Sequence, residues 1–262
     1  MPKLPLWMYF LLLLLRVKDI YYLTIYYLLP ISPITYYRLK MSIQQNITEI
    51  RKHIPKHVRL VCVSKFHPNE AVMEAYDCGE RIFGESKVQE MCGKYETLPK
   101  DISWHFIGHL QSNKIKFIVP FVELIHGVDS YKLLEEINKQ ALKAGKTVNC
   151  LLQIHIAREE TKFGFSEVEL LNTLSEGKWK ELTGLNVCGL MGMATYTDNR
   201  EQIRNELKGL KVLFDQVKDQ YFKDTAAFCE LSMGMSDDYQ IAIEEGSTLV
   251  RIGSSIFGNR EY

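Results

Sequence analysis

The residues whose types suggest chemistry stand directly after short apolar segments. Lys65 follows the apolar run 60–63, where an amine loses part of its hydration and so favours the neutral form that adds to carbonyl groups. Gly253, Ser254 and Ser255 follow the run 249–252 and open a short helical segment whose N–H groups and hydroxyls can bind a phosphate. Ser236 is expected to be the N-cap of another helix, so that its hydroxyl faces the same anion. Two ordinary capped helices would give the same pattern, and these segments alone leave both interpretations open.

A further chemical group is Arg251, which lies between Val250 and Ile252 in an apolar run. A buried guanidinium has to be paired or hydrated, because an unpaired charge in the interior is strongly destabilising. We therefore expect Arg251 to point into the lumen of a barrel or to reach its mouth. An amine, a phosphate cup and an arginine together suggest pyridoxal 5′-phosphate, which needs an amine for a Schiff base, a clamp for its phosphate and a partner for its ring nitrogen.

The segments that must position these residues alternate between short apolar runs and longer helical patterns. Helical patterns occur, for example, at Glu70–Asp77, Ser130–Ala144 and Asn199–Tyr221. Eight runs are apolar almost without interruption, as in parallel strands that are covered by helices. They are Leu60–Ser64, Arg81–Gly84, Trp104–Gly108, Leu124–Val128, Val148–His155, Leu185–Met191, Phe228–Met233 and Leu249–Gly253.

This alternation predicts an α/β fold, a single (β/α)8 TIM-type barrel over residues 41–262. A doubly wound open sheet is the alternative, but the chain has neither the G-x-G-x-x-G turn of dinucleotide-binding folds nor a P-loop. In a barrel the carboxyl ends of the strands carry the site. Lys65, Ser236 and Gly253 all follow expected strands, so the barrel would bring them to one end.

The neutral charge of the chain is a sum of two unlike parts. The 262 residues include 32 Lys and Arg and 32 Asp and Glu, which gives no electrostatic reason to expect nucleic acid as a partner. Residues 1–40 hold 7 of the 14 Tyr, five basic residues, one acidic residue and no glycine. Residues 41–262 are therefore mildly acidic, and the basic, aromatic part precedes them.

Residues 1–40 form a hydrophobic N-terminal extension with several possible roles. The run Leu6–Leu15 lies between Lys3 and Arg16 and is shorter than the roughly 20 apolar residues that span a membrane. It resembles the core of a signal peptide, but no A-x-A cleavage site follows it, and a pair of interfacial segments is a further alternative. From Met41 an ordinary amphipathic helix begins. We expect residues 1–40 to be unstructured and dispensable, or to lie upstream of the native start.

The six cysteines are scattered along the chain. None forms a C-x-x-C pair or a zinc-binding spacing, and several lie in apolar runs where a thiol serves as a small hydrophobic group. We therefore expect reduced cysteines, no metal site and a cytoplasmic protein.

Six stretches in order carry a resemblance to a known family: VSKFHP (63–68), FGESKVQE (83–90), WHFIGHLQSNK (104–114), GLM (189–191), SMGMSDD (232–238) and GSTLVRIGSSIFG (246–258). Through them the chain resembles the YggS/PROSC family of pyridoxal phosphate-binding proteins, which is related in fold to the N-terminal barrel of alanine racemase. The resemblance covers residues 41–262.

The resemblance implies that Lys65 carries the cofactor as N6-(pyridoxal phosphate)lysine, a Schiff base. It implies that Ser236, Gly253 and Ser254 hold the phosphate and that Arg251 faces the pyridine nitrogen. Because a guanidinium keeps its protons, it disfavours protonation of that nitrogen, and the ring becomes a poorer electron sink.

Two positions depart from the family pattern, and one methionine belongs to the expected site. Ser86 stands where the family commonly has an asparagine beside the cofactor ring, and its shorter side chain weakens that contact or leaves it to a water molecule. Phe163 is bulkier than the small or polar residue of a family Lys-x-Gly loop. Met191 is expected to pack against the cofactor or the core.

The resemblance implies a protein of intracellular pyridoxal phosphate homeostasis, a carrier or regulator without robust turnover, in which we assign no catalytic residue. A pyridoxal phosphate-dependent amino-acid racemase or related enzyme is the alternative. Such a racemase needs a second acid or base on the far face of the cofactor, which a second domain supplies in alanine racemase, and this chain ends at Tyr262, shortly after the phosphate cup. We expect a monomer, and pyridoxal phosphate-dependent apoenzymes are the candidate recipients.

The extension gives the first prediction. If residues 1–40 lie upstream of the native start, the native protein begins at Met41, where the first regular helix begins and after residues that match nothing in the family. Intact-mass measurement of the protein purified from its own cells checks this, and a mass that includes residues 1–40 would contradict it.

Overall fold

The computed structural model describes residues 42–158 and 163–258. The chain divides into two units, Met1–Met41 and Ser42–Tyr262, and everything described below belongs to the second. The expectation for residues 1–40 lies outside the described residues.

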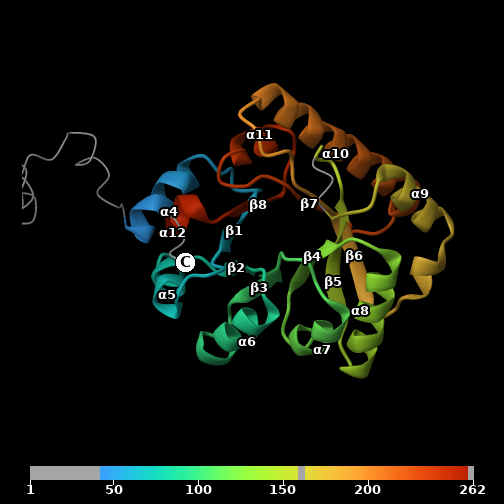
Figure 1. Ribbon diagram of the computed structural model, residues 1–262, viewed down its shortest axis with the longest axis horizontal. Coiled ribbons are helices and arrows are strands. Elements are labelled where there is room, and N and C mark those ends of the chain that lie inside the picture. Colours follow the sequence, from blue (N-terminus) through green and yellow to red (C-terminus); the bar gives the residue numbers. More distant parts are fainter. Residues whose placement is uncertain (1–41, 159–162, 259–262) are drawn as a thin grey trace, which may run out of the picture. The chain divides into compact units, whose positions relative to one another are not determined.

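Eight parallel strands form a closed barrel in sequence order (Figure 1). They are β1 (Arg59–Val63), β2 (Ile82–Glu85), β3 (Ser103–Phe106), β4 (Leu124–Val128), β5 (Val148–Ile154), β6 (Leu185–Gly192), β7 (Glu230–Ser232) and β8 (Leu249–Ile252). The barrel closes where β8 pairs with β1, with Cys62 opposite Ile252. All eight predicted strands are present, and this closure confirms the barrel over the open sheet. Only β7 is markedly shorter than the predicted Phe228–Met233.

Helices surround the strands, as Figure 1 shows. They are α4 (Ile43–Lys52), α5 (Asn69–Asp77), α6 (Val88–Thr97), α7 (Ile115–Ile118), α8 (Tyr131–Lys143), α9 (Glu167–Ser175), α10 (Arg200–Tyr221), α11 (Tyr239–Glu244) and α12 (Ser254–Phe257), with 3-10 turns at Ser112–Lys114 and Lys178–Glu181. No helix among the described residues is long and apolar enough to cross a membrane.

Local sequence explains where the main helices begin. Ser42 and Gln45 form a reciprocal capping box at the start of α4, the helix that the run from Met41 predicted. The side chains of Ser130 and Asn199 accept N–H groups at the starts of α8 and α10. These caps satisfy N–H groups that have no partner within the helix.

The apolar core has two parts. The larger part lies between strands and helices, and it includes Trp104, Phe83 and the inner faces of α8 and α10. The smaller part fills the lumen and consists of Val61, Leu124, Leu151, Cys188, Met191 and Leu249. The six cysteines are free, as the sequence predicted.

One glycine allows β6 and β7 to approach each other. Gly189 has φ +152°, and a Cβ there would lie 1.8 Å from the carbonyl oxygen of Glu230. A side chain is therefore excluded both by backbone conformation and by space. The register of β6 against β5 also shifts next to this residue, between Cys150 and Leu151.

We expect Gly189→Ala to lower the free energy of unfolding by about 2–4 kcal/mol, because it adds backbone strain to a steric clash. Gly209 lies in α10, where a Cβ would have no atom within 4 Å, and it is the matched control. Gly209→Ala should raise the free energy of unfolding by about 0.5–1 kcal/mol through helix propensity. Urea denaturation measures both, and equal effects of the two substitutions would contradict the packing argument.

Candidate functional site

The pairing of β1 with β8 brings Lys65 beside the turn that follows the last strand. Cys62 pairs with Ile252, so Val63 and Gly253 are neighbours across the seam. The approach is close, because a Cβ on Gly253 would lie 3.1 Å from the carbonyl oxygen of Val63. Lys65 is partly buried two residues beyond Val63. The seam therefore puts the amine-bearing turn and the serine-bearing turn at the same end of the barrel.

The hydroxyl of Ser236 meets the start of α12. Its Oγ accepts N–H groups from Gly253 at 3.4 Å and from Ser255 at 3.5 Å. Ser254 is exposed at the first position of the same helix. The first N–H groups of a helix have no partner within it, so this junction gathers hydroxyl and N–H donors with no carboxylate among them. Such a set can bind an anion.

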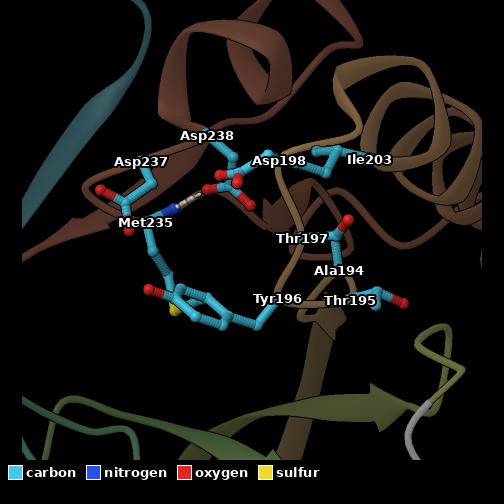
Figure 2. Close-up of a pocket in the computed structure, with 9 residues that line it drawn as sticks. All are labelled: Ala194, Thr195, Tyr196, Thr197, Asp198, Ile203, Met235, Asp237 and Asp238. Carbon is cyan, nitrogen blue, oxygen red and sulfur yellow. Dashed lines mark hydrogen bonds between the residues drawn. The ribbon is translucent and has the colours of Figure 1, made fainter.

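Ser236 reaches this junction from a turn and is not an N-cap, which corrects the sequence expectation. Helix α11 begins three residues later, at Tyr239, after Asp238. The Asp238 carboxylate accepts the N–H of Met235 at 2.5 Å (Figure 2). Gly234, just before this turn, has φ +93°. Because Asp238 closes the turn, Ser236 lies outside the helix and turns toward β8.

A cavity of about 450 Å³ borders this turn. Its lining comes from the segment after β6, from the start of α10 and from the turn after β7, namely Ala194, Thr195, Tyr196, Thr197, Asp198, Ile203, Met235, Asp237 and Asp238 (Figure 2). Burial raises the pKa of the Asp238 carboxyl, and the N–H of Met235 and the charge of Arg251 oppose that shift.

Arg251 is buried in β8, and its side chain enters the lumen as the sequence predicted. Nη1 donates to Ser232 Oγ at 2.6 Å, and Nη2 donates to the carbonyl oxygen of Gly192 at 3.1 Å. Burial lowers the pKa of Arg251 to about 10, and the Asp238 carboxylate counteracts that shift. The guanidinium is therefore a cation at neutral pH.

Two buried histidines extend this contact across the lumen, and sequence analysis assigned neither of them to the site. Ser232 Oγ lies 2.9 Å from His126 Nδ1, and His126 Nε2 lies 2.9 Å from His105 Nδ1. Burial lowers the pKa of His105 to about 3 and the pKa of His126 well below its usual value. The signal was available, since these polar residues interrupt apolar strands as Arg251 does.

Met191 and Ser86 occupy different strand ends. Met191 is buried in the lumen and pairs with Ser232 across β6 and β7, so it lies in the neighbourhood of Arg251. Ser86 follows β2, next to β1, and its carbonyl oxygen would lie 2.3 Å from a Cβ on Gly108. Both residues stand at the carboxyl end of the barrel, Met191 on the lumen side.

A second buried cation supports Lys65 from outside the barrel. Lys94 of α6 donates to Glu85 Oε1 at 2.7 Å, to Glu90 Oε1 at 2.8 Å and to the carbonyl oxygen of Ser64 at 2.8 Å. Ser64 Oγ also donates to Glu85 Oε1 at 2.6 Å. Burial raises the pKa of Glu85, while Lys94 and Ser64 act in the opposite direction.

The same cluster holds the residue on the other side of Lys65. Phe66 has φ +66°, a conformation that is uncommon for a residue with a side chain, and its N–H donates to Glu90 Oε1 at 2.6 Å. Ser64 and Phe66, the two neighbours of Lys65, therefore both form hydrogen bonds with the Lys94 cluster. The cluster fixes the backbone from which the Lys65 side chain extends.

A histidine and a carboxylate pair lie at the mouth as well. His109 Nδ1 is 3.0 Å from Asp129 Oδ2, and the His109 ring stacks on Phe163 with centroids 4.2 Å apart. Phe163 is 55% exposed. Asp129 gives the His109 ring a fixed orientation, which the sequence did not indicate.

The fold and the site define a closed (β/α)8 barrel with a lysine after its first strand and a junction of hydroxyl and N–H groups after its last. The chain belongs to the family described as "Alanine racemase, N-terminal domain", whose model matches residues 40–261. Two of its relatives are both named pyridoxal phosphate homeostasis protein. One relative, from Aquifex aeolicus, is 42% identical over 205 residues, which cover 78% of this chain and 88% of the relative. Another, from Schizosaccharomyces pombe, is 38% identical over 210 residues, covering 78% and 85%.

A solved structure also matches. PipY of Synechococcus elongatus, solved with pyridoxal phosphate bound, has a TM-score of 0.75 and 32% identity, over 83% of this chain and all of that chain. The same protein without the ligand gives a TM-score of 0.78. These findings confirm the family that the six sequence stretches indicated.

We expect Lys94→Met to lower the free energy of unfolding by about 3–5 kcal/mol, because it leaves the buried Glu85 carboxylate without its cation. Amide hydrogen exchange at Phe66 should also accelerate. Lys139→Met is the matched control, since Lys139 pairs with Glu136 on the surface and such pairs contribute about 0–1 kcal/mol. If both substitutions cost the same, the Lys94 cluster does not hold the Lys65 segment.

Proposed function

We propose that this protein binds pyridoxal 5′-phosphate as a Schiff base on Lys65 and acts in pyridoxal phosphate homeostasis. The observation that carries the proposal is the β1–β8 seam, which joins the Lys65 turn to the junction of Ser236 with Gly253 and Ser255. An amine and an anion-binding junction at one end of a barrel are what a phosphorylated aldehyde requires.

The donor set fits this ligand. The junction offers the hydroxyls of Ser236 and Ser254 and the first N–H groups of α12, which suit a phosphate. Arg251 uses two of its five N–H groups on described residues, and we propose that the ligand meets others of them. Met191, which is buried beside Ser232, supplies an apolar surface, and we propose Ser86 as a polar neighbour of the ring.

When bound, pyridoxal phosphate supplies an aldehyde for the lysine and a ring that can accept electrons. The Lys65 nitrogen adds to the aldehyde carbon, a C=N bond forms, and the aldehyde oxygen leaves as one molecule of water. The Arg251 cation disfavours a proton on the ring nitrogen, which limits the ring as an electron sink. These residues therefore hold the ligand without promoting proton loss from a bound amino acid.

Two further observations support homeostasis as the role. Relatives that match most of this chain are named pyridoxal phosphate homeostasis proteins, and PipY was solved with pyridoxal phosphate bound. A carrier must also release its ligand, and we propose pyridoxal phosphate-dependent apoenzymes as recipients. We further propose a monomer in the cytoplasm whose binding domain is residues 41–262, with free thiols as the support for that compartment.

Absorbance tests the Schiff base. We expect protein mixed with pyridoxal phosphate to develop the visible band of a lysine Schiff base, and borohydride to fix the label on the peptide that contains Lys65. Lys65→Ala should abolish both signals. Lys87→Ala is the control, since Lys87 is exposed at the next strand end, and it should retain both. A persistent band in Lys65→Ala would overturn the assignment.

Ser236→Ala tests the phosphate junction separately. It should weaken binding of pyridoxal phosphate by about 10- to 100-fold, because a hydrogen bond to a charged group contributes about 1.5–3 kcal/mol. Binding of pyridoxal, which lacks the phosphate, should change little. Equal losses for the two ligands would mean that Ser236 does not contact the phosphate.

The loaded protein also separates a carrier from a racemase. Incubation with L-alanine should leave its chirality unchanged over many equivalents, because a two-base racemase needs a second acid or base on the far face of the cofactor and we assign none. Sustained formation of D-alanine would show that the protein is a racemase and would overturn the carrier proposal.

A further inference from the structure

A chain of buried polar side chains crosses the lumen, and the proposed function uses only one end of it. The chain runs from Arg251 through Ser232 and His126 to His105, with donor–acceptor distances of 2.6, 2.9 and 2.9 Å. His105 lines a cavity of about 160 Å³ at the amino-terminal end of the strands. Polar contacts therefore connect the two ends of the barrel through its core.

The chemistry of the donors gives this chain a direction. A guanidinium has no acceptor, so Arg251 Nη1 must donate to Ser232 Oγ. Ser232 Oγ has one proton, and its other contact among the described residues is His126 Nδ1. If His126 donated from Nδ1, the buried hydroxyl proton of Ser232 would have no acceptor. Every group is satisfied only when Ser232 donates to an unprotonated His126 Nδ1.

The same count of protons can be continued to His105, at the amino-terminal end of the barrel. A neutral imidazole carries one proton, so His126 with a bare Nδ1 has its proton on Nε2 and donates to His105 Nδ1. His105 then carries its own proton on Nε2, and the cavity that His105 lines gives access to water. Burial and the nearby cation of Arg251 keep His126 neutral, which this count requires.

We propose that Ser232, His126 and His105 form a one-way hydrogen-bond chain in which both histidines are fixed as Nε2–H tautomers. Through this chain Ser232 and His126 act as positioning residues for the Arg251 guanidinium. Ser232 and the Gly192 carbonyl hold the two terminal nitrogens of Arg251. Because the bare Nδ1 of His126 accepts the Ser232 hydroxyl proton, that hydroxyl has one orientation, with its lone pairs toward Arg251. The guanidinium is then held in one rotamer, with its remaining N–H groups available to a ligand.

Nitrogen NMR of the protein without ligand tests the chain independently of the proposed function. We expect His105 and His126 both to show a protonated Nε2 and a bare Nδ1 at neutral pH. Ser232→Ala should remove the proton donor to His126 Nδ1, so that the His126 signals shift toward a mixture of tautomers. A protonated Nδ1 or a charged ring at His126 in the unsubstituted protein would overturn the proposal, even if Ser232→Ala does not fold.

Ser247→Ala is the matched control. Ser247 is also a buried serine next to β8, but its hydroxyl contacts the carbonyl oxygens of Leu231, Met233 and Leu249 and lies outside the chain. Its loss should leave the His126 signals unchanged. Equal shifts in both variants would mean that the His126 signals report general loosening of the core, and the proposal would fail.

The positioning role, which rests on the proposed function, has its own readout. In protein loaded with ¹⁵N-labelled pyridoxal phosphate, Ser232→Ala should shift the pyridine nitrogen signal, and Ser232→Thr, which restores a hydroxyl, should return it. An unchanged pyridine signal in Ser232→Ala would overturn the positioning role while leaving the tautomers and the Schiff base untouched. Failure of Lys65 to become labelled would overturn the proposed function and leave the NMR result on the unloaded protein intact.

Discussion

The barrel lumen contains a guanidinium that stays charged at neutral pH, and much of the site follows from that constraint. A buried cation needs acceptors and a balancing charge. Ser232 and the Gly192 carbonyl supply the acceptors, and the Asp238 carboxylate supplies the charge. Asp238 also closes the turn at Met235, and that turn sends Ser236 to the start of α12. Asp238 therefore links the buried charge of Arg251 to the turn that carries Ser236.

A second cation acts on the opposite side of the β-strands. Lys94 lies between α6 and the ends of β1 and β2, where it binds Glu85, Glu90 and the Ser64 carbonyl. Side chains alternate between the two faces of a strand, so Val61 lies in the lumen and Ser64 meets the outer cluster. Lys65 leaves the strand between these two polar systems, one inside and one outside, and its backbone is bound on both sides. These hydrogen bonds to Ser64 and Phe66 hold the Lys65 backbone in place, although Lys65 itself lies beyond the end of β1.

The sequence predicted the elements far better than the contacts between them. Uninterrupted apolar runs identify parallel strands, and the eight predicted strands are all present because each run is buried between lumen and helices. The prediction for Ser236 was wrong because Ser-Asp-Asp has the composition of a helix start, whereas Asp238 closes a turn that delays the helix to Tyr239. The Ser-Asp-Asp sequence does not show whether Asp238 caps a helix or accepts the N–H of Met235, and the start of α11 depends on that hydrogen bond.

The lumen chain was missed for a related reason. Its links join residues 21, 106 and 19 positions apart, so no window of sequence contains them together. What the sequence did contain was a polar residue in each of four apolar strands, and only Arg251 was recognised as unusual, because its charge makes burial costly. A neutral histidine or serine is tolerated in many cores and attracts less notice. In a closed barrel, however, inward positions of opposite strands face one another across a narrow lumen, so polar residues at inward positions must find each other or remain unsatisfied. Arg251 therefore requires acceptors inside the lumen, and it finds them in Ser232 on β7 and in the Gly192 carbonyl on β6. His126 on β4 is linked to it through Ser232.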